Sequence, residues 1–170
     1  EVGLPMLLGH IGVGLAAKKA APKVPVIVLL LAAEFMDILW LVFLVTGLEK
    51  SATLFTHPSI AWSHGLLMAV IWTIITVAAG LLIYQDKRSS LIIGLMVFGH
   101  WALDFISHPM GIGNHTPDLP LLFDSSPKVG LGLYRSLPGI LIGEVGLLAL
   151  GIFIYWRTVK PIRQNVTKNV

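Results

Sequence analysis

Four long stretches of this chain are almost free of charged residues. They cover residues 24–45, 58–85, 90–107 and 137–156. Each is close to, or longer than, the ~18–20 residues that a helix needs to cross the hydrocarbon core of a bilayer. A fifth apolar stretch, residues 4–17, is shorter, and we expect it to be a short N-terminal membrane segment. The sequence therefore predicts an all-α integral membrane protein, a bundle of four long transmembrane helices plus the shorter segment, five in all.

The composition supports lipid as the solvent of this chain. Only 12% of the 170 residues are charged and 55% are hydrophobic, whereas a soluble domain has about 25% charged residues. We expect one transmembrane helical domain over residues 1–160, with an outer loop at 109–136, and a polar cytoplasmic tail at 161–170. The basic residues form short clusters between apolar stretches and no stripe, so we expect no nucleic-acid partner. The chain has no cysteine, which excludes thiolate metal ligands.

The basic clusters predict how the chain is oriented. They lie between the first and second stretches, between the third and fourth, and after the last: Lys18, Lys19, Lys23, Lys87, Arg88, Arg157, Lys160 and Arg163. By the positive-inside rule these turns and the C-terminus are cytoplasmic. The N-terminus and the loops at 46–57 and 109–136 then face outside. We expect a protein of a prokaryotic cytoplasmic membrane.

Ionisable side chains inside the apolar stretches gather at one depth. They are His10, Glu34, Asp37, His57, His64, His100, Asp104, His108 and Glu144. With ~1.5 Å of rise per residue, nearly all of them fall in the predicted outer half of the bilayer. A charged group at the bilayer centre costs roughly 2.5–3.5 kcal/mol on insertion scales, so such groups need partners or a polar cavity. We therefore expect them to face one another inside the bundle.

The clearest local pattern is His100, Asp104 and His108, which are spaced four apart and share one helix face. Imidazole nitrogen and carboxylate oxygen are ligands of zinc and other divalent first-row ions. Glu34 and Asp37 add carboxylates three apart on another helix. The pattern predicts a divalent metal site, with zinc as the expected ion.

Simpler interpretations stay open for several of these residues. A lone intramembrane histidine such as His10 often serves only as an interhelical hydrogen bonder. Glu34 and Glu144 could be protonated hydrogen-bond donors, because burial favours the neutral acid. His57 and His115 lie in predicted loops and could be surface residues. The long outer loop could be a lid over the polar cluster or an exposed connector.

The order of these motifs resembles that of the bacterial and archaeal membrane-bound metal-dependent hydrolases, also called LexA-binding inner-membrane hydrolases. That family has an N-terminal Gly-His, an Asp in the first long helix, a Ser-His that opens a later helix, and a Gly-His-x-x-x-Asp helix. The matching positions are Gly9-His10, Asp37, Ser63-His64, and Gly99-His100 with Asp104. The resemblance covers about the first 110 residues. It departs from the family's Pro-Asp-x-Asp-like pair, where this chain has Glu34 and Asp37 without the proline.

The resemblance implies a metal-dependent hydrolase, and we expect it to act on a lipid or lipid-linked substrate at the outer leaflet. The expected metal ligands are His10, Asp37, His64, His100 and Asp104. Glu34 or His108 is expected to act as the general base or to support the ligands by hydrogen bonding. Membrane lipids are the expected partners; a homo-oligomer or a larger membrane complex stays open.

Three other functions are alternatives to a hydrolase. Metal-ion or proton transport would use the same residue types, but a conduit also needs polar residues in the inner half. A small accessory subunit of a larger membrane complex is a further alternative. A histidine-box di-iron oxygenase fits less well, because such enzymes have about eight clustered histidines and this chain has six in all.

Overall fold

A computed structural model of the chain describes residues 6–50 and 59–168, and it is mostly helical. The elements in chain order are α1 (Leu8–Ala17), α2 (Val26–Ala33), α3 (Phe35–Thr46), α4 (Ala61–His64), α5 (Leu66–Tyr84), α6 (Lys87–Ser107), β1 (Leu119–Pro120), β2 (Lys128–Val129), the 3-10 turn η1 (Leu133–Arg135), α7 (Leu137–Leu141), the π-helical segment η2 (Ile142–Gly146) and α8 (Leu147–Lys168). The strands form a small antiparallel ribbon in the long loop, with Leu119 opposite Val129. The predicted all-α class is confirmed.

Three helical stretches are long and apolar enough to cross a membrane: α5, α6 and the continuous stretch Leu137–Lys160. Helices α2 and α3 pass the same test only as a pair, and they are bent by 58°. Helix α1 has 10 residues. These features support a membrane protein, and the continuous helix expected over residues 24–45 is instead two helices that meet at Glu34.

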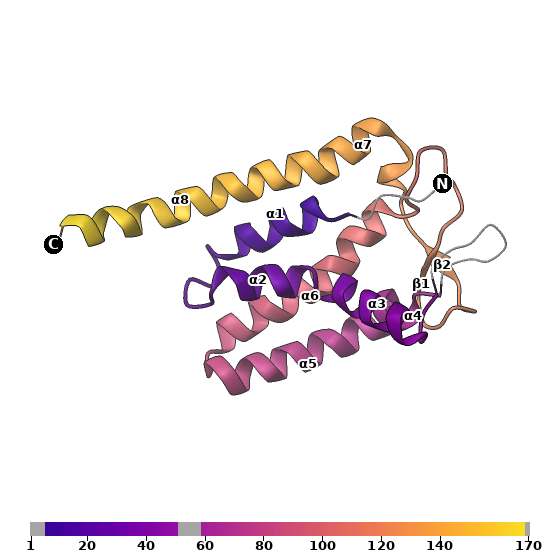
Figure 1. Cartoon of the computed structure of the whole chain (residues 1–170), viewed down its shortest axis with the longest axis horizontal. Coiled ribbons are helices and arrows are strands. Elements are labelled where there is room, and N and C mark those ends of the chain that lie inside the picture. Colours follow the sequence, from indigo (N-terminus) through magenta and orange to yellow (C-terminus); the bar gives the residue numbers. More distant parts are fainter. Residues whose placement is uncertain (1–5, 51–58, 169–170) are drawn as a thin grey trace.

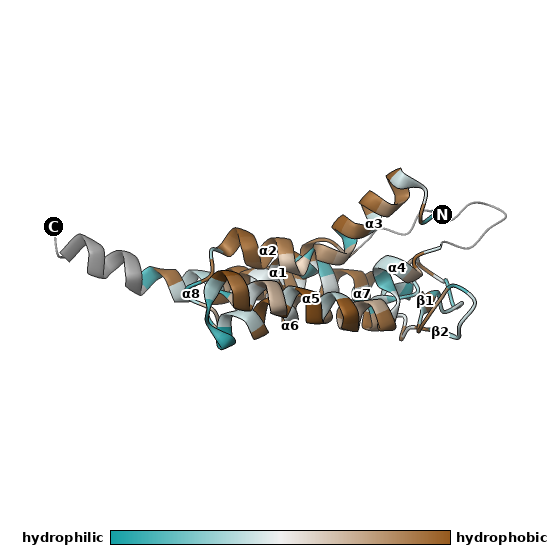
Figure 2. Ribbon diagram, turned by 90° about the horizontal axis from the view of Figure 1, so that it is seen from below, coloured by the Kyte–Doolittle hydropathy of each residue, from teal (hydrophilic) through white to brown (hydrophobic). Residues whose placement is uncertain are grey.

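The surface of the helices is that of a protein in lipid. On α5, Leu82 is 81% exposed and Ile83 is 73% exposed, and Val45 on α3 is 79% exposed. Large apolar side chains exposed in such numbers would be unfavourable in water. Figure 2 shows apolar residues along most of the helices, with hydrophilic residues at the ends of the helical body.

The short turns that carry basic residues and the long loop that carries the β1–β2 ribbon lie at opposite ends of the molecule (Figure 1). Helices α5 and α6 pack side by side, and α2 packs against α6 and α1. The α1–α2 and α5–α6 turns lie at one end, and the β1–β2 ribbon and the start of α1 lie at the other. The tail predicted at 161–170 continues α8 as helix to Lys168.

Helix α1 lies against α8 at very short range. A Cβ atom on Gly12 would collide with the backbone of Leu147 and Leu148, and one on Gly151 would collide with the backbone of Gly12. Glycine is required at both positions, because only a missing side chain lets the two backbones approach this closely. This contact fixes α1, and with it His10, relative to the C-terminal span.

Candidate metal centre

Five of the residues expected as metal ligands converge inside the bundle. His10 comes from α1, Asp37 from α3, His64 from α4, and His100 and Asp104 from α6. Potential ligand atoms form three overlapping groups, and within each group they all lie within 4.8 Å of one another. The groups are His10 with His100 and Asp104, Asp37 with His64 and His100, and His10 with Glu34 and Asp37. His10 and His100 are 1% exposed and Asp104 is 2% exposed.

Four short nitrogen–oxygen distances connect four of these side chains. His64 Nε2 lies 3.2 Å from Asp37 Oδ1 and 3.6 Å from Asp104 Oδ2. His100 Nε2 lies 3.3 Å from Asp104 Oδ2 and 3.8 Å from Asp37 Oδ1. Ligand atoms about 2.0–2.1 Å from a tetrahedral zinc ion lie roughly 3.3 Å from one another. The spacing therefore matches the edges of a coordination tetrahedron.

The break between α2 and α3 orients His100. Glu34 leaves the helical conformation, with φ −96° and ψ 8°. In a continuous helix the Ala33 carbonyl would accept from the N–H four residues on; here it lies 2.6 Å from His100 Nδ1. Because a carbonyl can only accept, Nδ1 carries a proton, and Nε2 is the ring nitrogen that faces the cluster. A carbonyl partner of this kind is typical behind a metal-ligating histidine.

A second chain of hydrogen bonds orients His64. Glu49 is 1% exposed, and its carboxylate accepts from the Ser63 backbone N–H at 2.8 Å and from the Ser63 hydroxyl at 2.7 Å. The Ser63 hydroxyl, having donated its proton, accepts from His64 Nδ1 at 2.7 Å. Nδ1 of His64 is thus engaged outside the cluster, and its Nε2 faces the cluster, 3.2 Å from Asp37 Oδ1.

Sequence reasoning did not single out Glu49. It lies in a predicted outer loop, three residues after the end of α3. It reaches Ser63 because Lys50 and Ser59 pair their backbones in both directions. An acidic residue in a loop carries no signal of such a contact, since the contact depends on how the loop folds back.

Glu144 positions the start of α1. Its Oε2 accepts from the backbone N–H groups of Leu8 and Gly9, at 2.7 and 3.1 Å, and its Oε1 accepts from the Tyr134 hydroxyl at 2.9 Å. A helix N-terminus has unpaired N–H groups and a partial positive charge, and a carboxylate satisfies both. Glu144 thus acts as an acceptor, in contrast to the donor role considered from the sequence. It holds α1 at the two residues that directly precede His10.

The two residues expected to transfer protons are placed differently. Glu34 lies in the group with His10 and Asp37. His108 follows the end of α6 and belongs to none of the three groups found among the described residues; its Nδ1 lies 2.7 Å from Asp118 Oδ1 in the long loop. Burial, the largest single influence, lowers the pKa of His108, but the hydrogen bond with Asp118 and the charges of the nearby carboxylates together raise that pKa above its ordinary value.

The remaining histidines lie away from the cluster or beyond the described residues. His115 is exposed in the long loop, and His57 lies outside the described residues. The loop itself is fastened to the start of α5 and to the residue that precedes α4. Leu121 accepts from the Leu67 backbone at 3.0 Å, and Asp124 accepts from the Ile60 backbone at 3.1 Å.

Comparisons with protein-family models, with curated proteins and with solved structures gave no match. The interpretation of the site therefore depends on its own geometry.

Proposed function

We propose that this chain is a metal-dependent membrane hydrolase that holds a divalent ion among His10, Asp37, His64, His100 and Asp104. The observation that carries the proposal is the convergence of imidazole nitrogens and carboxylate oxygens from four helices in a buried interior. Two of the imidazoles already use Nδ1 as a donor elsewhere, so Nε2 is the ring nitrogen that each can offer to an ion inside the cluster. The nitrogen and oxygen donor set favours zinc.

The charge balance of the cluster supports a cation. Every ion pair that Asp37 and Asp104 make with a described residue has a histidine as the partner. Asp104 is buried and Asp37 is partly buried, and carboxylate charge in a low-dielectric interior is strongly unfavourable without a positive partner. A divalent ion would neutralise both carboxylates and use the free imidazole nitrogens.

The chemistry follows from the donor set. A divalent ion of this kind supplies Lewis acidity and an activated water at neutral pH. The protein residues hold the ion, and Ala33, Ser63 and Glu49 fix the tautomers of the two histidines. Glu34 is better placed than His108 to act at the site, because His108 is engaged by Asp118.

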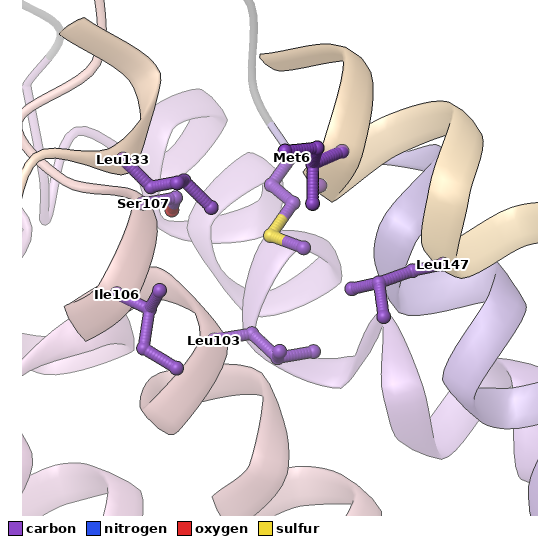
Figure 3. A pocket seen from close by; sticks show the side chains of 8 residues that line it. Met6, Leu103, Ile106, Ser107, Leu133 and Leu147 are labelled. Carbon is purple, nitrogen blue, oxygen red and sulfur yellow. The ribbon is translucent and has the colours of Figure 1, made fainter. Parts of the chain in front are cut away.

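An apolar cavity beside α6 supports a lipid or lipid-linked substrate. It has a volume of about 200 Å³, and Figure 3 shows Leu103 and Ser107 of α6 facing Met6 and Leu147 across it. Leu103 is the sequence neighbour of Asp104. Small-molecule pockets usually measure ~300–1,000 Å³, so this cavity suits part of an acyl chain and not a whole lipid.

The topology that accompanies this function has α1 as a short span and the bent α2–α3 pair as one span, making five. The basic turns lie at the end of the bundle opposite the long loop, which favours an outer-leaflet site. Toward the basic end, the buried core includes Ile93, Met96 and Val97, which are poor lining for an ion conduit.

The metal content of the purified protein tests the proposal. The chain is purified in detergent, stripped with chelator, dialysed against Zn²⁺ and analysed for metal. We expect stoichiometric zinc in the wild type, loss of zinc in Asp37→Ala and His100→Ala, and no change in the His115→Ala control. Zinc retained by both site variants would refute the site. Zinc-dependent release of products from a panel of lipids, followed by mass spectrometry, tests the hydrolase; bound zinc with no turnover of any lipid would leave a metal centre and reject the reaction.

A further inference from the structure

The cluster has more ligands than one ion can use. His64, His100, Asp37 and Asp104 already supply four donor atoms, connected by distances of 3.2–3.8 Å, which is the full number of ligands of a tetrahedral ion. Beyond them lie His10 and Glu34. Neither ring nitrogen of His10 and neither carboxylate oxygen of Glu34 has a hydrogen-bond partner among residues 6–50 and 59–168, although all four atoms are buried. Buried polar atoms without partners are strongly unfavourable, so these atoms point to a further ligand.

The stacking of two rings separates His10 from the first ion. The rings of His10 and His100 are stacked, with centroids 3.8 Å apart and an interplanar angle of 22°. An imidazole binds a metal through a lone pair in the plane of its ring. An ion between two stacked rings would meet their faces, so nearly parallel rings direct their lone pairs toward two neighbouring points. In two-metal sites the ions are ≈ 3.5–4 Å apart, which matches the ring separation.

The carboxylates are placed to serve both points. Asp104 turns Oδ2 toward His64 and His100, at 3.6 and 3.3 Å, and turns Oδ1 toward His10, at 3.6 Å. Asp37 belongs to the group of His64 and His100 and also to the group of His10 and Glu34. A carboxylate that faces different nitrogens with its two oxygens has the arrangement of a bridging ligand.

We propose that the chain binds a second divalent cation, held by His10 and Glu34 and sharing Asp104 and Asp37 with the first ion. This inference rests on the proposed metal centre; it moves His10 from the first ion to the second and changes the role of Glu34 from proton transfer to ligation. The family's Pro-Asp-x-Asp-like pair supplies two carboxylates, and Glu34 with Asp37 supplies two carboxylates here as well.

Metal stoichiometry distinguishes the second site from the first. Chelator-stripped protein is titrated with Zn²⁺, and bound zinc per chain is measured after equilibrium dialysis. We expect two ions in the wild type, one in His10→Ala and in Glu34→Gln, and one in His64→Ala. His115→Ala and Asp86→Asn remove a histidine and a carboxylate outside the site, and both should keep two ions. Size-exclusion profiles and melting curves of the stripped variants check that each has folded; Glu34→Gln keeps the shape of the side chain, which protects the test from misfolding.

A second probe reads the distance between the ions. Wild-type protein loaded with Mn²⁺ should give the electron paramagnetic resonance spectrum of a coupled pair, and Glu34→Gln should give the six-line spectrum of an isolated ion. A wild type that saturates at one ion, with His10→Ala unchanged, would overturn the second site and leave the first intact. A wild type that binds no ion would reject both. Loss of all metal from His10→Ala would mean a single shared site and would also overturn the inference.

Discussion

Replacing Glu49 with glutamine should weaken metal binding, because it should move the ring proton of His64 from Nδ1 to Nε2 through the Ser63 hydroxyl. The carboxylate accepts both the backbone N–H and the hydroxyl of Ser63. A glutamine has one acceptor oxygen and one amide donor. Because the backbone N–H can only donate, the glutamine oxygen must face it, and the amide then donates to the Ser63 hydroxyl. The hydroxyl reverses and donates to His64 Nδ1, which places the ring proton on Nε2.

The expected size of the effect follows from what that proton blocks. A protonated Nε2 cannot ligate, so His64 must either change tautomer against its neighbours or leave the coordination shell. Loss of such a supporting contact typically lowers metal affinity 10–100-fold, or about 1.4–2.7 kcal/mol. Ser63→Ala removes the connection without forcing either tautomer, so its loss of affinity should be smaller than that of Glu49→Gln.

Two measurements test this order. Competition with a chromophoric chelator in detergent gives the zinc affinity of the wild type and both variants. Nitrogen-15 shifts of labelled histidine in the stripped protein report the tautomer of His64, which should change from Nδ1–H to Nε2–H in Glu49→Gln. Unchanged affinity in Glu49→Gln, or a greater loss in Ser63→Ala than in Glu49→Gln, would refute the reasoning.

Two further changes test how α1 is held. Glu144→Ala leaves the Leu8 and Gly9 N–H groups without their acceptor, so the free energy of unfolding should fall by about 1–2 kcal/mol. Glu144→Gln keeps one acceptor oxygen, so its free energy of unfolding should fall less. Equal melting temperatures for Glu144→Ala and the wild type would contradict the capping role. Gly12→Ala forces α1 away from α8 and should destabilise the protein by about 1–3 kcal/mol, whereas Gly99→Ala, whose added Cβ meets no described atom within 4 Å, should melt like the wild type. Equal destabilisation by the two alanines would rule out the close approach as the cause.

Hydropathy was sufficient to place the apolar stretches, because membrane helices must pair their backbone groups internally and so need continuous length. It could not locate the break at Glu34. The sequence there has neither proline nor glycine, the usual causes of a kink. The break instead coincides with a tertiary contact, the bond between His100 and the Ala33 carbonyl. A contact between helices leaves no mark on the local pattern.

In the candidate site too, spacing along one helix could be read from the sequence, whereas contacts between distant segments could not. The spacing of His100 and Asp104 was readable because residues four apart share a helix face. Extending that ladder to His108 failed to bring it into the cluster, since α6 ends at Ser107 and the residue before a proline rarely stays helical. Gly99, the glycine of that Gly-His motif, makes no close contact, since an added Cβ would meet no described atom within 4 Å. Glu49 and Glu144 act through contacts that only the folded chain creates.

Helix α1 depends on a part of the chain that is synthesised long after it. The N-terminal turn of α1 is capped by Glu144, and its middle rests on Gly151, so both supports emerge from the ribosome after every other ligand-bearing helix. We therefore expect His10 to reach its place only once α8 has been made. Full metal uptake would then follow the synthesis of α8, which ties ion loading to the folding of the complete bundle.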